Sequence, residues 1–393
     1  MRSGDHGRLR PLQAAPADLR RRLRTRAAGG PDSGADVRLT AAPVPGPDAL
    51  PVYGLAAVFA AAALVVWLAG TRLAMAGDEL AERYGLAKEF VGLLFLATVT
   101  ELPEIVTTVT AAQVGNAQLV LGNMFGGITI QTAILAAADI FAVRYALTSW
   151  PRKPNHALLA VLLIALLSVL LCVTFLGDLD LGPGIGLGAI LLAAGFPLVI
   201  YLLRVFDRKT TWAPVDLPGE QERHKTLRAH LRAKDAASNR VLLLRSAVCS
   251  LLILAAGAAL ALSADLLAER TQLGASFVGV TLLAAATSLP ELSTTLAAAR
   301  IGAYTMAISN IFGSNLIMLA LLLPADIAFR GGPILDHATT GAQLSIATGI
   351  LVTAIYVAGL LIRRTPRILG AGLDSWLVLA VYFSSIAALY RIG

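Results

Sequence analysis

The chain has 393 residues, of which 56% are hydrophobic and only 15% are charged. A water-soluble globular domain carries about 25% charged residues, so this composition, with a mean hydropathy of +0.72, excludes an ordinary soluble protein. The apolar residues form runs of about 20, the length of a helix that crosses a bilayer. We therefore predict an all-α polytopic membrane protein, embedded in a lipid bilayer and without a nucleic-acid partner.

Residues 1–50 precede the first apolar run and are rich in proline, glycine and arginine, with RRLRTR at 21–26 as the densest basic part. Such a composition cannot bury a core, so we predict a disordered tail. The tail does not resemble a signal peptide, because its basic part is too long and no apolar segment follows it directly.

Ten apolar segments follow, five on each side of a polar and basic segment at 206–240. We predict spanning helices at about 52–70, 89–112, 117–138, 157–176, 183–205, 241–263, 275–299, 303–325, 341–362 and 372–390. The predicted organisation is a tail (1–50), a first five-helix repeat (51–205), a basic cytoplasmic loop (206–240) and a second five-helix repeat (241–393).

An internal repeat relates the two halves. A shift of 187 residues aligns 90–140 with 277–327 without a gap and gives 23 identities in 51 positions. Apolar helices share leucine and alanine by chance, but here many identities are polar or break helices. The paired residues include Thr100 and Thr287, Pro103 and Pro290, Glu104 and Glu291, Asn123 and Asn310, Gly126 and Gly313, and Asp139 and Asp326.

The orientation of the halves follows from the number of spans. Five is an odd number, so we expect the two repeats to be inverted relative to each other. If the loop at 206–240 is cytoplasmic, 20 lysines and arginines between the spans lie inside and two, Arg270 and Arg330, lie outside. The positive-inside rule selects this topology, although it places the arginine-rich tail outside. We expect a multi-pass protein of the cell (plasma) membrane.

Two similar strings place carboxylates inside apolar segments: TELPE at 100–104 and TSLPE at 287–291. A carboxylate at bilayer depth costs roughly 3 kcal/mol or more, so it persists mainly where it faces a polar cavity or binds something. Each proline removes a backbone hydrogen bond and frees carbonyls near Thr100 and Thr287. Broken helices from two inverted repeats, meeting near the midplane, form the ion site of many secondary transporters. Their oxygen ligands suit hard cations.

At these residues the chain resembles the sodium/calcium exchanger superfamily, the calcium/cation antiporters. That family has two inverted α-repeats, each with a T-S-L-P-E signature in one helix and a G-N-x-x-G-S-N stretch in the next. The corresponding strings here are TELPE with GNMFGGI and TSLPE with SNIFGSN. The resemblance implies an antiporter that moves Ca²⁺ or a related cation in exchange for Na⁺ or H⁺ by alternating access, with no cofactor beyond the transported cations.

The resemblance also implies the ligands. Glu104 and Glu291 would be the central cation ligands, and Thr100 and Thr287 would contribute backbone carbonyls. The Ser of G-S-N and the side chain four residues later would complete the sites. The further candidates are Glu101, Ser288, Gln131, Ser314, Asn123 and Asn310.

The chain departs from the family pattern in both repeats. In the first repeat Glu101 replaces the signature serine and Gly127 replaces the G-S-N serine, while Gln131, four residues later, is an adequate ligand. In the second repeat Ser314 is kept, but Met318 follows it, and a thioether cannot bind a hard cation. The chain has thus lost one ligand and gained a carboxylate. We expect Glu101 to hold a proton more readily than the other two, which favours cation/proton exchange over Na⁺ coupling alone.

Other interpretations stay open. Glu104 and Glu291 would otherwise form a structural network, and Asn123 and Asn310 would join helices rather than bind ions or gate. For Asp139 and Asp326, near helix ends, a capping or interface role is favoured over transport. The sequence contains no nucleophile–base pair or histidine cluster, so we do not expect an enzyme. A passive cation channel and a Na⁺/H⁺ exchanger without Ca²⁺ transport are the alternatives.

For an exchanger, we predict that the carboxylates of Glu104 and Glu291 lie within about 10 Å.

Overall fold

The computed structural model describes residues 50–143, 145–151, 154–182, 184–207, 238–270, 285, 287–363 and 366–392. All but the last residue of the predicted tail, most of the predicted loop at 206–240 and the first part of the span predicted at 275–299 lie outside these residues. The boundaries of the two five-helix repeats therefore stay a prediction.

The described residues are almost entirely helical. The first half contains α2 (Val52–Arg83), α3 (Lys88–Phe90), the π-helix η2 (Val91–Leu96), α4 (Ala97–Thr100), α5 (Leu102–Gln113), α6 (Ala117–Ala142), the 3₁₀ turn η3 (Leu147–Ser149), α7 (Asn155–Leu176) and α8 (Leu187–Asp207). The second half contains α10 (Asn239–Arg270), α12 (Leu289–Arg300), α13 (Tyr304–Ala328), the 3₁₀ turn η4 (Ile334–His337), α14 (Thr340–Ile362), an antiparallel hairpin of β1 (Arg367–Ile368) and β2 (Ala371–Gly372), and α15 (Leu373–Ile392).

Eight helices of the described part are long and apolar enough to cross a membrane, or nine if the bent pair Lys88–Thr100 and Leu102–Gln113 forms one span. The all-α polytopic prediction is confirmed, and the predicted number of ten is approximate. The span predicted at 275–299 is described mainly from Leu289 onward, as α12.

The first helix is longer than predicted. The apolar run at 52–70 ends before Arg72, but α2 continues to Arg83 and buries Leu73, Ala74 and Asp78 on the way. A helix satisfies its own backbone groups, so it extends beyond an apolar run wherever the following residues favour helix.

The predicted helix break lies at the expected place. The segments Lys88–Thr100 and Leu102–Gln113 are bent by 49° relative to each other, with Glu101 between them. Pro103 occupies the second position of α5, where the missing N–H is tolerated, and Pro290 occupies the same position of α12. Each proline thus marks the first turn of a helix and separates it from the chain before it.

The repeat is visible in the backbone. α5 and α12 both end two residues before a glycine with positive φ, Gly115 at +79° and Gly302 at +75°. The amide after each glycine bonds to the carbonyl five residues earlier, at 2.9 Å and 2.8 Å respectively. Both helices therefore end in the same left-handed cap, which glycine adopts without strain.

Asp139 and Asp326 also have matching roles. One oxygen of each accepts a 2.6 Å hydrogen bond from the backbone amide eight residues later. The other oxygen of Asp139 accepts from Gly372, before α15, and that of Asp326 accepts from Gly186, before α8. Both aspartates tie the end of a central helix to neighbouring loops, which is the capping role favoured by the sequence.

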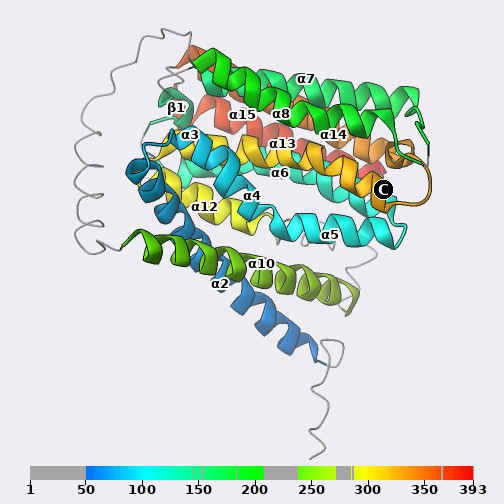
Figure 1. The fold of residues 1–393 in the computed structure, drawn as a ribbon, viewed down its shortest axis with the longest axis horizontal. Coiled ribbons are helices and arrows are strands. Elements are labelled where there is room, and N and C mark those ends of the chain that lie inside the picture. Colours follow the sequence, from blue (N-terminus) through cyan, green and yellow to red (C-terminus); the bar gives the residue numbers. More distant parts are fainter. Residues whose placement is uncertain are drawn as a thin grey trace, which may run out of the picture. The chain divides into compact units, whose positions relative to one another are not determined.

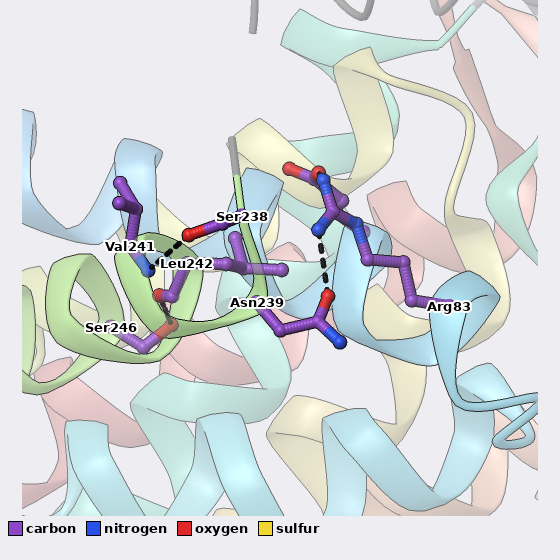
Figure 2. A network of polar contacts seen from close by, with 7 residues as sticks. Arg83, Ser238, Asn239, Val241, Leu242 and Ser246 are labelled. Carbon is purple, nitrogen blue, oxygen red and sulfur yellow. Dashed lines mark hydrogen bonds and ion pairs between the residues drawn. The ribbon is translucent and has the colours of Figure 1, made fainter. Parts of the chain in front are cut away.

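The two most buried long helices are α6 and α13, which pack on each other. α13 also contacts η2, α8 and α12, and α6 contacts α5, α12, α14 and α15. α2 and α10 lie side by side (Figure 1). At one end of this pair the Arg83 guanidinium donates a 2.8 Å hydrogen bond to Oδ1 of Asn239 (Figure 2). The first turns of α5 and α12 therefore meet beside the buried pair α6 and α13.

Candidate cation-binding site

Three carboxylates meet in the interior of the protein. Glu101 occupies the break between α4 and α5, Glu104 lies in the first turn of α5, and Glu291 lies in the first turn of α12. Each is exposed by 1% or less. One carboxylate oxygen from each lies within 4.8 Å of the other two, which is closer than the sequence led us to expect.

The positions of the helix starts explain this arrangement. Because α5 and α12 begin one residue before the prolines, Glu104 and Glu291 sit where backbone amides lack helical partners and the helix dipole favours negative charge. Glu101 precedes Glu104 by three residues, about one helical turn, so both carboxylates lie on the same side of the chain. A continuous helix would not place its amino end at this depth.

The signature threonines contribute reciprocally to the cluster. The side chain of Thr287, in the second repeat, interacts with the carboxyl group of Glu104, in the first. The side chain of Thr100, in the first repeat, interacts with the carboxyl group of Glu291, in the second. Both threonines are buried, with exposures of 0% and 3%. This exchange of partners is what a pseudo-two-fold relation between the repeats produces.

Glu101 has polar neighbours from two central helices. The Gln131 side-chain amide, from α6, donates a 2.6 Å hydrogen bond to Oε1 of Glu101. The hydroxyl of Ser314, from α13, lies near this carboxyl group and is buried without a hydrogen-bond partner among the described residues. All three residues are fully buried. The structure thus joins the additional carboxylate to one residue that the sequence proposed as a ligand, Gln131, and places it near a second, Ser314.

Most oxygens of the cluster lack a hydrogen-bond donor. Both carboxylate oxygens of Glu104 and of Glu291, Oε2 of Glu101 and Oε1 of Gln131 are buried and accept no hydrogen bond from the described residues. An unsatisfied buried carboxylate is costly, so these oxygens need a cation or protons to neutralise them.

The opposite side of the pseudo-two-fold is apolar. A shift of 187 residues pairs Gln131 with Met318 and Ser314 with Gly127. Met318 is buried, and a Cβ added at Gly127 would lie 2.6 Å from its methyl carbon and 3.0 Å from its sulfur. The thioether therefore fills the space that a side chain at position 127 would occupy. Where one side presents an amide and a hydroxyl, the other presents only this packed pair.

Asn310 joins two helices. Its Nδ2 donates 3.1 Å hydrogen bonds to the hydroxyls of Thr294 and Thr295 in α12. Its repeat partner Asn123 differs, because Nδ2 of Asn123 is buried without a partner among the described residues, as is the hydroxyl of Thr108. The interpretation of Asn310 as a link between helices is thus supported, and the two repeats hold this link differently.

The predicted ligands divide into two groups. Seven converge on the carboxylate cluster: Glu101, Glu104, Glu291, Thr100, Thr287, Gln131 and Ser314. The other three do not. Asn310 links α13 to α12, Asn123 has no partner for its Nδ2 among the described residues, and Ser288 is buried next to Thr287. One residue was missed: Asn315, whose Nδ2 donates 3.3 Å to Thr132 and joins α13 to α6. The signal for it was its place as the last residue of SNIFGSN.

Known proteins resemble this chain over most of its length. A family model described as sodium/calcium exchanger protein matches residues 54–212 and 241–391. The candidate antiporter CaxA of Alkalimonas amylolytica is 26% identical over 311 residues, covering 78% of this chain and 91% of that protein. The inner membrane protein YrbG of Escherichia coli (strain K12) is 24% identical over 330 residues, covering 82% and 95%.

Solved structures share the fold. The sodium-calcium exchanger NCX_Mj soaked with 2.5 mM Na⁺ and 0.1 mM Sr²⁺ superposes with a TM-score of 0.61 at 17% identity, covering 86% of this chain and 99% of that one. The same exchanger soaked with 10 mM Na⁺ and no Ca²⁺ gives 0.61 at 18% identity, covering 86% and 100%.

Proposed function

Because the chain belongs to the sodium/calcium exchanger family, we propose that it moves Ca²⁺ or a related divalent cation across the cell membrane in exchange for H⁺ or Na⁺. The observation that carries the proposal is the cluster of Glu101, Glu104 and Glu291, with oxygens within 4.8 Å and mostly without donors. Carboxylate, amide and hydroxyl oxygens are ligands suited to Ca²⁺ and Na⁺. No cofactor is needed beyond the transported cations.

The charge of the cluster supports obligatory exchange. Three ionised carboxylates within 4.8 Å would repel one another strongly in a buried site. The protein therefore cannot change the side of the membrane to which the site opens while the site is empty and fully charged. A departing divalent cation must be replaced by protons or by other cations. Antiport follows, because the neutralised forms are the ones that reorient.

Glu101 is the proposed carrier of a coupling proton. With a divalent cation bound, three carboxylates leave one negative charge uncompensated. Gln131 donates to one oxygen of Glu101 and leaves the other without a donor, so a proton can reside there. This accounting favours divalent cation/proton exchange over Na⁺/Ca²⁺ exchange alone.

A passive channel is the second candidate, and the burial of the cluster argues against it. The three carboxylates are exposed by 1% or less, whereas conduction requires a continuous path to both solutions. The differing asparagine links also suit alternating access. In a pair of inverted repeats, the opposite-facing state is expected to close the Asn123 link and open the Asn310 link.

Reconstituted proteoliposomes test this function. Ca²⁺ flux is measured while Na⁺ and pH gradients are imposed separately and the membrane potential is clamped. We expect uptake to follow a proton or Na⁺ gradient at zero potential. Uptake that follows the potential alone would identify a channel, and Na⁺/H⁺ exchange with no Ca²⁺ flux would identify the other alternative. The control is Glu104→Gln/Glu291→Gln protein in the same lipids.

A further inference from the structure

His156, the second residue of α7, is a buried histidine outside the carboxylate cluster. Its exposure is 1%, and its Nε2 lies 3.1 Å from the backbone oxygen of Thr305 and 3.1 Å from the hydroxyl of Ser309, both in α13. A carbonyl oxygen only accepts hydrogen bonds, so Nε2 carries a hydrogen. This contact fixes the tautomer and leaves Nδ1 as the atom whose protonation is free to change.

Nδ1 of His156 has no hydrogen-bond partner among the described residues, although it is buried. The histidine lines a small pocket, with an empty volume of about 300 Å³ including its open mouth, which is also lined by Glu89, Phe90 and Leu203. Leaving a buried acceptor unsatisfied costs about 1–3 kcal/mol, so Nδ1 is an open position for a water molecule, or for a proton if a nearby carboxylate compensates its charge.

Burial and charge act on His156 in opposite directions. Burial in the protein interior disfavours a charged imidazole most strongly, and Glu89, from α3, is the charged group that favours one. Arg204, from α8, lies over the ring of Phe90, with its guanidinium carbon 5.6 Å from the ring centre. α13 contributes the neutral Thr305 and Ser309, and α14, which packs along α7, contains no acidic or basic residue. Residues 152 and 153, just before α7, lie outside the described residues.

We propose that His156 is a second proton-binding site, separate from the carboxylate cluster, and that a proton bound at its Nδ1 and paired with Glu89 controls the rate of exchange. Imidazole is the side chain whose ordinary charge change falls between about pH 5 and 8. The chain segments on either side of this pocket, before α3 and before α7, are those that the positive-inside rule predicts to be cytoplasmic. The proton would therefore report cytoplasmic pH.

The contacts of α13 connect this site to the cation site. His156 binds α13 at Thr305 and Ser309, and the next residue, Asn310, is linked to α12, whose first turn holds Glu291. On the other side, Gly92 in η2 allows that segment to lie directly on the backbone of α13. Attraction between a protonated His156 and Glu89 would draw α7 and α3 toward each other, and both of these helices contact α13.

Histidine NMR tests the binding of the proton without any transport assay. The protein has five histidines, and the signal of His156 is identified by its absence in His156→Gln protein in nanodiscs. We expect this signal to titrate between about pH 5 and 8, with a lower midpoint in Glu89→Gln, because removal of the carboxylate disfavours the imidazolium. A signal that does not titrate in this range, or that ignores Glu89→Gln, overturns the proposal.

Flux in oriented membrane vesicles tests the control of exchange. When pH is varied only on the cytoplasmic side, we expect wild-type flux to change about threefold or more across this range and His156→Gln to lose that change. The matched control is His337→Gln, an exposed histidine in η4, near the opposite end of α7. If His156→Gln lowers flux uniformly and keeps the wild-type profile, the role is structural and the proposal is wrong. Should His156→Gln fail to fold, the Glu89→Gln profile decides in the same way.

Discussion

The buried side chains of Gln131 and Glu101 are joined by a 2.6 Å hydrogen bond. Glu101 stands where the family signature has serine. Their repeat partners, Met318 and Ser288, provide a thioether and a hydroxyl instead of an amide and a carboxylate. Met318 packs on Gly127, where the second repeat has Ser314. The site therefore has a polar side and an apolar side, and a bound cation is expected to lie toward Glu101.

Removing one central charge tests the site itself. Glu104→Gln and Glu291→Gln should each reduce exchange by about 100-fold or more, because the amide keeps the volume but removes a charge interaction of a few kcal/mol with a desolvated cation. Flux in proteoliposomes measures the loss, and size-exclusion chromatography of the purified variant shows that it folds. Flux at the wild-type rate in either variant would refute the assignment of these ligands.

Glu101→Ser restores the family signature and tests proton coupling. In the wild type, protons and the cation compete for the three carboxylates, so cation binding should weaken as pH falls. With only Glu104 and Glu291 left, the charge excess disappears, and we expect a flatter pH dependence with cation binding retained. The measurement is Ca²⁺-dependent flux between pH 6 and 9. A variant that keeps the wild-type profile would show that Glu101 carries no coupling proton and would favour Na⁺/Ca²⁺ exchange.

The sequence predicts this site well where the repeat and the prolines act together. Pro103 and Pro290 fix where α5 and α12 begin, and the acids one residue later must then lie in first turns that meet across the repeats. The full length of α2 and the β1–β2 hairpin were not predicted, because neither depends on an apolar run. Contacts between positions that are distant in the sequence could not be predicted either. Met318, 191 residues from Gly127, fills the space beside that glycine, and only the packing of α6 on α13 determines this contact.

The packed pair on the apolar side can be tested by exchanging both members. Gly127→Ser alone should destabilise the protein by about 1–3 kcal/mol, because its Cβ would lie 2.6 Å from the methyl carbon of Met318. Adding Met318→Gln removes the thioether and recreates the amide and hydroxyl of the polar side. We expect the double variant to recover stability and to gain a second cation position, seen as a steeper dependence of Tm on Na⁺ concentration. Additive losses of stability with no change in Na⁺ dependence would contradict the coupling of these positions.

The asparagine links should set which side the site faces. Asn310→Ala removes two hydrogen bonds that hold α13 to α12 in the state seen here, and each typically contributes about 0.5–1.5 kcal/mol. Asn123→Ala should instead disfavour the opposite state, in which its own link is expected to form. We therefore expect the two variants to shift the equilibrium between states in opposite directions, by about threefold or more each.

Labelling of a cysteine introduced at Ser288, in a background without Cys172 and Cys249, measures this equilibrium from each side of the membrane. Asn310→Ala should raise labelling from one side, and Asn123→Ala should lower it there and raise it from the other. The matched control is Asn315→Ala, which removes a link between α13 and α6 rather than one between α12 and α13. Equal shifts in the same direction for Asn123→Ala and Asn310→Ala would show that the difference between the repeats is not part of alternating access.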